Sequence, residues 1–236
     1  MLTDKKVIIF DMDGTLIDSV GIWNDVDRAL VEKLGGDPAD TDIQARRDDA
    51  MRRHHTAENP YLEYCAELGE IYDSPLSPEE IFKTRYGIAQ HFLKEVMDYK
   101  PDADVFINEL KSRGYTLAIA STTRRNNLDI YRTQNENFLK KAPIDEYFSV
   151  VYAREDAVKT KPDPEIYLEV MSTLKVSPEE CLIFEDSLIG LEAAKASGAQ
   201  TAVIYDRYSD ADREALNAMA DYTFDTYAEA LATISK

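Results

Sequence analysis

Short apolar runs alternate with helical patterns over most of the chain. Five runs are apolar at nearly every position, which is typical of strands buried on both faces of a parallel sheet; they are residues 6–10, 115–120, 148–152, 181–184 and 201–205. Apolar residues recur at helical spacing in three of the intervening segments, residues 102–113, 163–175 and 187–197. This alternation predicts an α/β fold with a doubly wound parallel sheet.

The stretch from residue 19 to residue 99 breaks the alternation. It contains no convincing strand pattern, whereas Tyr61, Tyr64 and Leu68 recur at helical spacing. A crossover between parallel strands needs only about a dozen residues, so an insertion of this length forms a module of its own. We expect an inserted all-helical cap domain at residues 19–99, and an α/β core formed by residues 1–18 and 100–236.

Composition narrows the classes of partner. The chain has 236 residues with 27 Lys and Arg against 45 Asp and Glu, which gives a net charge of −18. Such a charge disfavours nucleic-acid backbones and anionic membrane surfaces as partners. No apolar run approaches the roughly 18 residues that span a bilayer, no export signal is recognisable, and two distant cysteines suggest no disulfide framework. We therefore expect a cytoplasmic protein.

Polar residues follow the first four apolar runs, where an open α/β sheet binds its ligands. In chain order they are Asp11, Asp13, Ser121, Lys161, Glu185 and Asp186. Clustered carboxylates repel one another unless a cation holds them together, and hard oxygen ligands suit Mg²⁺. A hydroxyl and a lysine on the same rim suit the oxygens of a phosphate group. The pattern predicts a site for Mg²⁺ and a phosphorylated ligand.

The first two aspartates can divide the chemistry between them. Asp11 and Asp13 are two positions apart, so their side chains point the same way on an extended segment. One carboxylate can attack phosphorus while the other transfers protons to the leaving group and from water. Gly14 allows a sharp turn, and we expect the Thr15 hydroxyl to donate a hydrogen bond that positions Asp13.

These residues resemble the four motifs of the haloacid dehalogenase superfamily. The motifs are Asp11-x-Asp13-Gly14-Thr15, the strand-end Ser121, Lys161-Pro162 and Glu185-Asp186-Ser187. Residues 13–19 and the helical insertion resemble the β-phosphoglucomutase-like phosphatase group within it. The resemblance implies a Rossmann-like core, a mobile cap, Mg²⁺ and an aspartyl-phosphate intermediate.

The resemblance also implies a role for each matching position. Asp11 is the expected nucleophile and metal ligand, and Asp13 is the expected general acid and base, with its backbone carbonyl on the metal. Asp186 is a direct metal ligand, and Glu185 is either a second ligand or an outer-shell partner. Ser121 is expected to bind the transferring phosphoryl group, and Lys161 to offset the charge on the nucleophile and the phosphoryl group, so both are expected catalytic residues. Thr15 and Thr122 are expected to bind the substrate. Dehalogenases lack the second aspartate, so its presence disfavours carbon–halogen chemistry.

Two departures from the family pattern leave alternatives open. Thr160 occupies a position that is usually glycine, so Lys159 competes with Lys161 for the place facing the phosphoryl group. The segment from Ser121 to Lys161 is several residues longer than expected, and we assign the excess to the polar stretch at residues 134–137.

The cap has its own candidate residues. Arg46 and Arg47 are basic residues in an acidic chain and could meet the distal part of the substrate or its phosphate. The alternative, which we favour for most residues of this basic segment, is a solvated helix face paired with Asp48 and Asp49. Trp23 is expected in the cap core, with substrate stacking as its alternative role.

The sequence therefore predicts a phosphoric monoester hydrolase. It would be a Mg²⁺-dependent phosphatase that hydrolyses a small phosphorylated metabolite, a sugar or polyol phosphate, through an aspartyl-phosphate intermediate. The alternative is a sugar phosphomutase, which passes the group to a second hydroxyl. A non-catalytic binding or regulatory protein is the remote alternative, and intact Asp11 and Asp13 argue against it.

Overall fold

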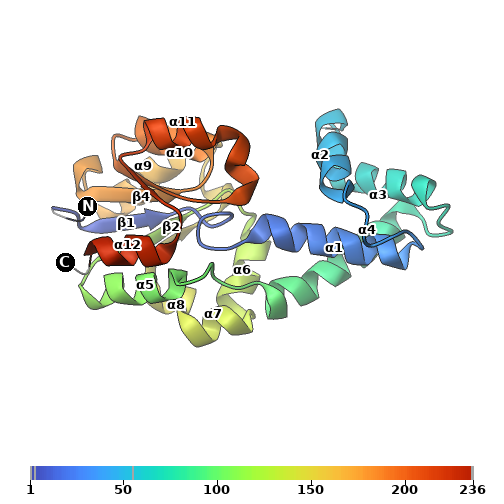
Figure 1. The fold of residues 1–236 in the computed structure, drawn as a ribbon, viewed down its shortest axis with the longest axis horizontal. Helices are drawn as coiled ribbons and strands as arrows, with labels where there is room; N and C mark the ends of the chain where they lie inside the picture. Colours follow the sequence, from blue (N-terminus) through green and yellow to red (C-terminus); the bar gives the residue numbers. More distant parts are fainter. Residues whose placement is uncertain (1, 3, 55, 235–236) are drawn as a thin grey trace. The chain divides into compact units, whose positions relative to one another are not determined.

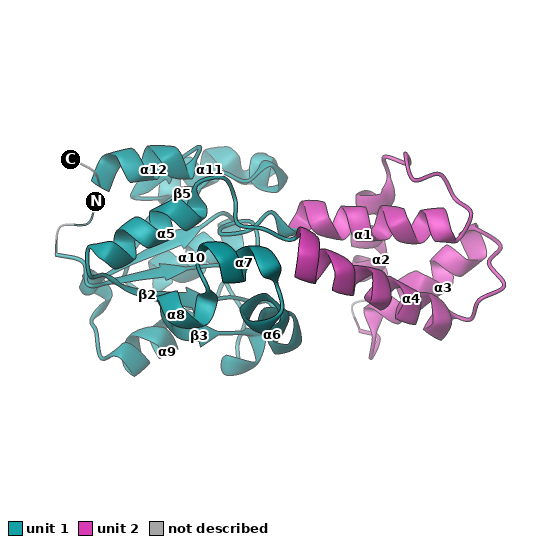
Figure 2. Cartoon of the chain, turned by 90° about the horizontal axis from the view of Figure 1, so that it is seen from below, with its two compact units in different colours: residues 1–19, 97–236 teal, residues 20–96 magenta. Residues whose placement is uncertain are grey.

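A computed structural model describes residues 2, 4–54 and 56–234 of the chain. The chain divides into two compact units, shown in different colours in Figure 2. The core unit consists of Met1–Ser19 and Met97–Lys236, and the helical unit consists of Val20–Val96. These bounds lie close to the division expected from the sequence. In the described part of the chain, no helix is long and apolar enough to cross a membrane.

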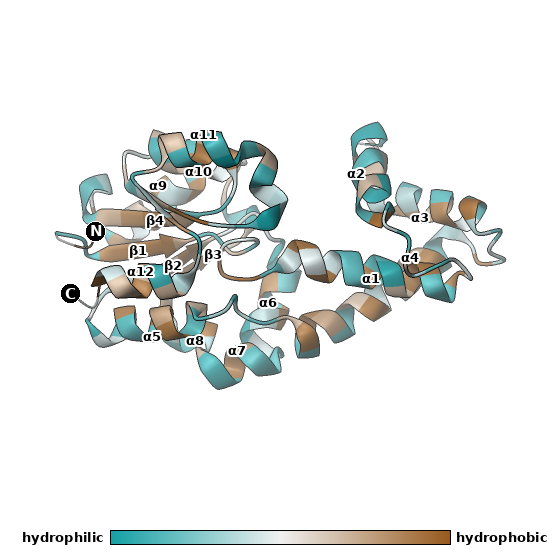
Figure 3. Ribbon diagram, viewed as in Figure 1, coloured by the Kyte–Doolittle hydropathy of each residue, from teal (hydrophilic) through white to brown (hydrophobic). Residues whose placement is uncertain are grey.

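The core unit is built on a six-stranded parallel sheet with the strand order β3-β2-β1-β4-β5-β6. Five strands match the apolar runs, and the short sixth strand was not expected; the strands are β1 (Val7–Phe10), β2 (Thr116–Ala120), β3 (Phe148–Tyr152), β4 (Cys181–Glu185), β5 (Gln200–Ile204) and β6 (Tyr222–Phe224). Figure 3 shows the hydrophobic character of the central strands. The Rossmann-like α/β class predicted for the core is confirmed.

Helices cover both faces of this sheet (Figure 1). They are α5 (Ala103–Ser112), α6 (Arg125–Thr133), α7 (Glu136–Lys141), α8 (Ile144–Tyr147), α9 (Glu165–Leu174), α10 (Leu188–Ala196), α11 (Arg213–Met219) and α12 (Tyr227–Ile234). Helices α9, α10 and α11 lie on one face, while α5 and α12 lie on the other. Three short 3₁₀ helices, Arg154–Asp156, Pro178–Glu180 and Arg207–Asp212, lie in the connections.

The two faces of the sheet bury different side chains, because successive residues of a strand point in opposite directions. Val7 and Ile9 pack toward α9 and α10 in a mainly aliphatic cluster. Phe10 faces the other side, where its ring stacks on Phe184 at 5.1 Å and meets Phe106 of α5 edge-on at 6.3 Å. Both faces are therefore closed by side chains, and the carboxyl ends of the strands are left to carry polar groups.

The helical unit has a separate hydrophobic core. Its elements are α1 (Ser19–Lys33), α2 (Ile43–Arg53), α3 (Pro60–Ile71), α4 (Pro78–His91) and a π-helical turn at Phe92–Val96. Buried Leu30, Tyr64, Leu68 and Ile81 bring the helices together. Helix α4 begins with a capping box, in which the Ser77 hydroxyl accepts from Glu80 N–H and the Glu80 carboxylate accepts from Ser77 N–H. The helices predicted from apolar spacing are thus present.

The polar stretch at residues 134–137 is more ordered than a surface excursion. Asn135 is fully buried and caps α7, because its side-chain oxygen accepts a hydrogen bond from Phe138 N–H at 2.9 Å. The side-chain amides of Asn135 and Asn137 both donate to the carbonyl of Met97, at 2.9 and 3.0 Å. The stretch therefore joins the end of α6 to the start of α7, and its two asparagines bind the chain at Met97, where it re-enters the core unit.

Candidate active site

The strand-end residues named from the sequence converge at the carboxyl edge of the sheet. Backbone hydrogen bonds extend the strand pairing into two of them, because Asp11 N–H donates to Phe184 O and Ser121 N–H donates to Tyr152 O, both at 3.0 Å. Glu185 is the last residue of β4. The sheet therefore fixes the backbone positions of these side chains directly.

Three carboxylates form a buried acidic cluster. Asp11, Glu185 and Asp186 are 6%, 1% and 7% exposed, and one oxygen from each lies within 4.8 Å of the others. Asp13 lies outside this cluster among the described residues. The carboxylates of this cluster are thus close enough together to bind one metal ion. For Asp13, metal binding was expected through the backbone carbonyl, not the side chain.

Lys161 is the cation that enters the cluster. Its ammonium group lies 2.5 Å from Asp11 Oδ1, 2.7 Å from Glu185 Oε1 and 3.1 Å from the carbonyl of Ala120. The competing Lys159 pairs instead with Asp163 at 3.0 Å, and its side chain is 67% exposed. The geometry therefore favours Lys161 for the place facing the phosphoryl group.

The electrostatics of the cluster reflect an excess of negative charge. Burial raises the pKa of the Asp11 carboxyl to about 8, although Lys161 opposes this shift. Burial and the neighbouring Glu185 and Asp11 carboxylates raise the pKa of Asp186. Burial alone would lower the pKa of Lys161, but Asp11 and Glu185 raise it well above its usual value. The Lys161 ammonium thus pairs with two of the three carboxylates, Asp11 and Glu185, while Asp186 has the Thr15 hydroxyl as its hydrogen-bond donor.

Two glycines leave the space in which these carboxylates sit. Gly14 has a φ of +81°, and a Cβ added there would overlap the carboxylate of Asp186. A Cβ at Gly190, in the first turn of α10, would overlap the carboxylate of Glu185. Both acidic side chains therefore occupy volume that any larger residue would fill.

This donor set fits a divalent cation of the Mg²⁺ type. Oxygen ligands from one or two carboxylates, completed by water and substrate oxygens, are what Mg²⁺ prefers. Asp11 and Asp186 would hold the ion, with Glu185 as a further candidate. Burial is the main cause of the raised pKa of both aspartates and neighbouring carboxylates add to it, so a cation at this position would favour their ionised forms.

The environment of Asp13 differs from the expectation. Thr15 is fully buried, and its hydroxyl donates to Asp186 Oδ1 at 2.8 Å rather than to Asp13. The hydrogen bond to the Asp13 carboxylate comes from the hydroxyl of Thr123. Thr123 was not singled out from the sequence, although it belongs to the same Ser-Thr-Thr run after β2 as Ser121.

The predicted phosphate-binding hydroxyls lie in different surroundings. Ser121 is buried, and its hydroxyl oxygen accepts from Thr123 N–H at 3.0 Å. Thr122, between them, is exposed. The Ser121–Thr123 segment is thus a tight turn that holds two hydroxyl groups at the edge of the acidic cluster.

The two arginines proposed for substrate binding already have partners within the helical unit. Arg46 pairs with Asp40 at 2.7 Å and donates to the Tyr72 hydroxyl at 3.0 Å. Arg47 is only 7% exposed and pairs with Asp27 at 2.7 Å. Arg47 therefore does not lie on the solvated face expected as the alternative, and a role in substrate binding stays a prediction for both residues.

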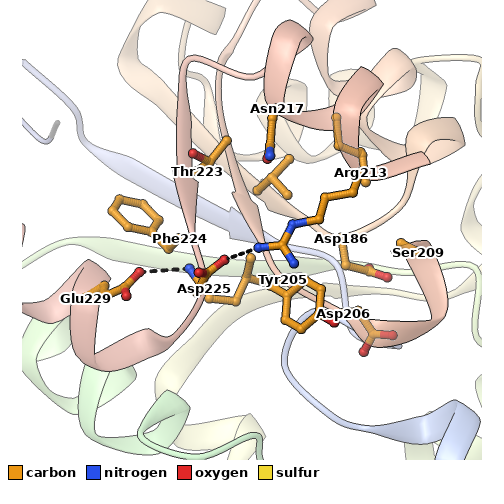
Figure 4. Close-up of a pocket in the computed structure, with 13 residues that line it drawn as sticks. Asp186, Tyr205, Asp206, Ser209, Arg213, Asn217, Thr223, Phe224, Asp225 and Glu229 are labelled. Carbon is orange, nitrogen blue, oxygen red and sulfur yellow. Dashed lines mark hydrogen bonds and ion pairs between the residues drawn. The ribbon is translucent and has the colours of Figure 1, made fainter. Parts of the chain in front are cut away.

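A small polar pocket lies beside the acidic cluster, beyond the ends of β5 and β6 (Figure 4). It has a volume of about 160 Å³, and Asp186, Asp206 and Ser209 lie together at one end of it. Asp206 also forms an ion pair with Lys100 at 2.8 Å. Asp186 therefore borders both the acidic cluster and this pocket.

Comparison with known proteins gives consistent matches. The family profile described as haloacid dehalogenase-like hydrolase matches residues 8–204. A phosphorylated carbohydrates phosphatase from Thermotoga maritima is 32% identical over 83% of this chain and 82% of its own length. A bifunctional riboflavin kinase/FMN phosphatase from Arabidopsis thaliana is 27% identical over 92% of this chain, which spans only 54% of that relative.

Solved structures agree with these matches. A Thermotoga maritima structure provisionally named a β-phosphoglucomutase superposes with a TM-score of 0.74 at 27% identity. The alignment covers 93% of this chain and 94% of the other. The likeness thus includes both the α/β core and the helical insertion.

Proposed function

The chain belongs to the haloacid dehalogenase-like hydrolase family, and from this premise we propose that it is a Mg²⁺-dependent phosphatase acting on a small phosphorylated metabolite. The observation that carries the proposal is the buried cluster of Asp11, Glu185 and Asp186 with Lys161 in its midst. Packing gives no reason to bury three carboxylates beside one lysine. The binding of a cation and a phosphoryl group does give a reason for burying these charged side chains together.

Asp11 is the proposed nucleophile. One of its carboxylate oxygens is held by Lys161, and attack on phosphorus would form an aspartyl phosphate as the bond to the leaving alcohol breaks. Asp13 would donate a proton to that alcohol and then remove one from the water that hydrolyses the acyl phosphate. The Thr123 hydroxyl donates a hydrogen bond to the Asp13 carboxylate and so fixes its orientation.

The remaining groups would stabilise the charge of the transferring phosphoryl group. Lys161 offers an ammonium group, and Ser121 offers a hydroxyl at the carboxyl end of β2, next to the Ala120 carbonyl that Lys161 contacts. Mg²⁺, when held by Asp11 and Asp186, supplies further positive charge at the phosphoryl oxygens. Positioning and electrostatic stabilisation of this kind account for most of the catalysis in phosphoryl transfer.

A sugar or polyol phosphate is the proposed substrate class. The relative that shares 32% identity is named a phosphatase of phosphorylated carbohydrates, and its similarity extends over most of both chains. The Arabidopsis relative is named for FMN, whose phosphate is also attached to a polyol chain. We include a cytoplasmic location in the proposal, since Cys65 and Cys181 are both free, buried thiols.

The direct test is phosphate release from a panel of sugar and polyol phosphates with Mg²⁺ present. We expect EDTA to abolish release and added Mg²⁺ to restore it. Asp11→Asn should lower kcat at least about a thousandfold, because it removes the nucleophile. Asp163→Asn is the matched control, since this carboxylate pairs with Lys159 outside the cluster and should leave kcat within about twofold. Metal-independent turnover, or an active Asp11→Asn enzyme, would contradict the proposal.

A sugar phosphomutase is the second candidate, favoured by the structural likeness to the provisionally named β-phosphoglucomutase. Both outcomes would use the same acidic cluster and differ in the acceptor of the phosphoryl group. Incubation with glucose 1-phosphate separates them: free phosphate identifies a phosphatase, and glucose 6-phosphate identifies a mutase.

A further inference from the structure

Two arginines share a single carboxylate inside the helical unit. Arg47 Nη1 donates to Asp27 Oδ2 and Arg85 Nε donates to Asp27 Oδ1, both at 2.7 Å. All three residues are buried, with Asp27 fully inaccessible. Asp48 lies 3.8 Å from Arg47, beyond hydrogen-bond distance, and is half exposed to solvent. Among the buried groups, two guanidinium groups therefore face one carboxylate, which leaves one excess positive charge.

The Arg85 guanidinium also has an unmet donor. Its Nη2 group is buried, and no described residue accepts a hydrogen bond from it. The Tyr64 hydroxyl, which interacts electrostatically with Arg85, is likewise buried without a partner among the described residues. Leaving a buried polar group without a hydrogen-bond partner is unfavourable, because the group has lost its hydrogen bonds to water. Two such groups beside an excess positive charge are the surroundings that an anionic oxygen ligand would satisfy.

Two aromatic rings determine how a ligand can approach. The Arg85 guanidinium lies 5.1 Å from the Trp23 ring centroid and 4.9 Å from that of Tyr61. Both rings are within cation–π distance of the guanidinium, and a guanidinium can bind an oxyanion in a bidentate manner through its edge. Tyr61 is 38% exposed and Trp23 is half-buried, so the two rings connect the site with solvent.

We propose that Arg85, between Trp23 and Tyr61, forms a phosphate-binding site within the helical unit, separate from the acidic cluster of the core unit. A phosphate group has enough oxygens to accept from the guanidinium edge and from the Tyr64 hydroxyl together. Burial raises the pKa of Tyr64, so this hydroxyl keeps its proton at neutral pH. The site adds a second anion-binding position that the proposed hydrolysis does not itself require.

Trp23 makes the site directly observable, because it is the only tryptophan in the chain. We expect inorganic phosphate, titrated at constant ionic strength into protein treated with EDTA, to change Trp23 emission saturably. Arg85→Met should abolish this response, since Asp27 and Arg47 are then left as a balanced pair. The fluorescence measurement needs no turnover, so its result does not depend on whether the proposed phosphatase activity is correct.

Two control variants locate the signal. Arg53→Met removes an exposed arginine of the same unit, paired with Asp49 and Glu67, and should keep the response. Lys161→Met removes the cation of the acidic cluster and should keep it as well. Arg85→Lys keeps the charge but loses the bidentate edge, and should bind phosphate at least about tenfold more weakly, which covers the case of a poorly folded Arg85→Met.

The source of the phosphate group is decided by a second titration, with glucose 6-phosphate and the inactive Asp11→Asn chain. Tighter binding of the sugar phosphate than of inorganic phosphate assigns the site to a metabolite, and equal or weaker binding assigns it to free phosphate. A response that survives Arg85→Met, or that disappears in Lys161→Met, would overturn the site. The absence of any saturable change would also overturn it and would leave ordered water as the partner of Arg85.

Discussion

Single side chains decide how the acidic cluster of Asp11, Glu185 and Asp186 is held. Glu185 accepts from the Lys161 ammonium and the Tyr167 hydroxyl, while Asp186 accepts from the Thr15 hydroxyl. A glycine in α10, the helix that follows β4, also matters, because Gly190 has no side chain and so leaves room for the Glu185 carboxylate. The positions of these carboxylates are thus set by their immediate neighbours and by the space those neighbours leave.

Gly190→Ala is expected to displace the Glu185 carboxylate, because the added methyl group would occupy its volume. We expect a loss of about 1–3 kcal/mol in the free energy of unfolding, the range for overpacking, and a reduced affinity for Mg²⁺. Gly87→Ala is the matched control in helix α4, where nothing lies within 4 Å of the new Cβ. That change should stabilise the chain by up to about 1 kcal/mol. Urea unfolding checks both, and equal effects would refute the steric argument.

Thr123→Val is expected to slow turnover by releasing the Asp13 carboxylate from its hydroxyl partner. A loss of about 10- to 100-fold in kcat, with a smaller change in KM, would fit misplacement of a proton-transferring group. Thr123→Ser restores the hydroxyl and should recover most of the rate. A valine variant with the pH profile and kcat of the unaltered enzyme would show that Thr123 does not position Asp13.

At the scale of helices and strands, the regular part of the fold follows from the sequence. Strands apolar on both faces, such as β1 and residues 181–184 of β4, are recognisable because their burial leaves no polar positions within the run. The polar residues after these strands are equally visible, since ligands bind where parallel strands end. Three of the four carboxylates expected there therefore form the acidic cluster, with Asp13 outside it, whereas the short strand β6, with only three residues, carries too little pattern.

Interactions between distant segments account for what the sequence did not reveal. Asn135 caps α7 and also binds the carbonyl of Met97, which is 38 residues earlier in the chain. Neither partner is encoded by local periodicity. The hydrogen bond from Thr15 to Asp186 and the pairing of Arg47 with Asp27 are of the same kind. Periodicity identifies elements and strand ends, but the choice among nearby polar partners depends on packing.

Asp221 directly precedes β6 and binds Lys195 of α10 and Thr201 of β5. These contacts predict how the free energy of unfolding depends on pH. Burial opposes ionisation of Asp221, but the Lys195 ammonium at 3.0 Å and the N–H and hydroxyl of Thr201 outweigh it and lower its pKa. Because the pKa is lower in the folded chain, the stabilisation is complete above the unfolded value of about 3.9 and is lost as the pH falls through the folded value.

Asp221→Asn should therefore reduce the free energy of unfolding at pH 7 by at most about 1 kcal/mol, since the ion pair is a third exposed. The difference from the unaltered chain should shrink below about pH 4. Asp212→Asn is the control, because that exposed carboxylate makes no side-chain cap for α11. Urea unfolding at several pH values measures both. A difference that grows on acidification would have the wrong sign.

At the scale of the whole molecule, each of the two units has a hydrophobic core of its own, and among the described residues these two cores share no member. Val7, Ile183 and their neighbours form the core of the α/β unit, while Leu30, Leu68 and Ile81 form that of the helical unit. Residues 20–96 are inserted between β1 and β2, so the α/β sheet forms from segments on both sides of the insertion. Unfolding of one unit would therefore remove no side chain from the hydrophobic core of the other.

Leu68→Ala tests this independence, because Leu68 is fully buried in the core of the helical unit. Loss of its packing should cost that unit about 2–5 kcal/mol. We expect amide hydrogen exchange to accelerate in helices α1–α4 and to stay unchanged in strands β1–β5, because local opening follows cooperative units. Ile183→Ala, in the core of the α/β unit, should produce the reverse pattern. If Leu68→Ala accelerated exchange in the sheet as much as in the helices, the two cores would have to unfold as one.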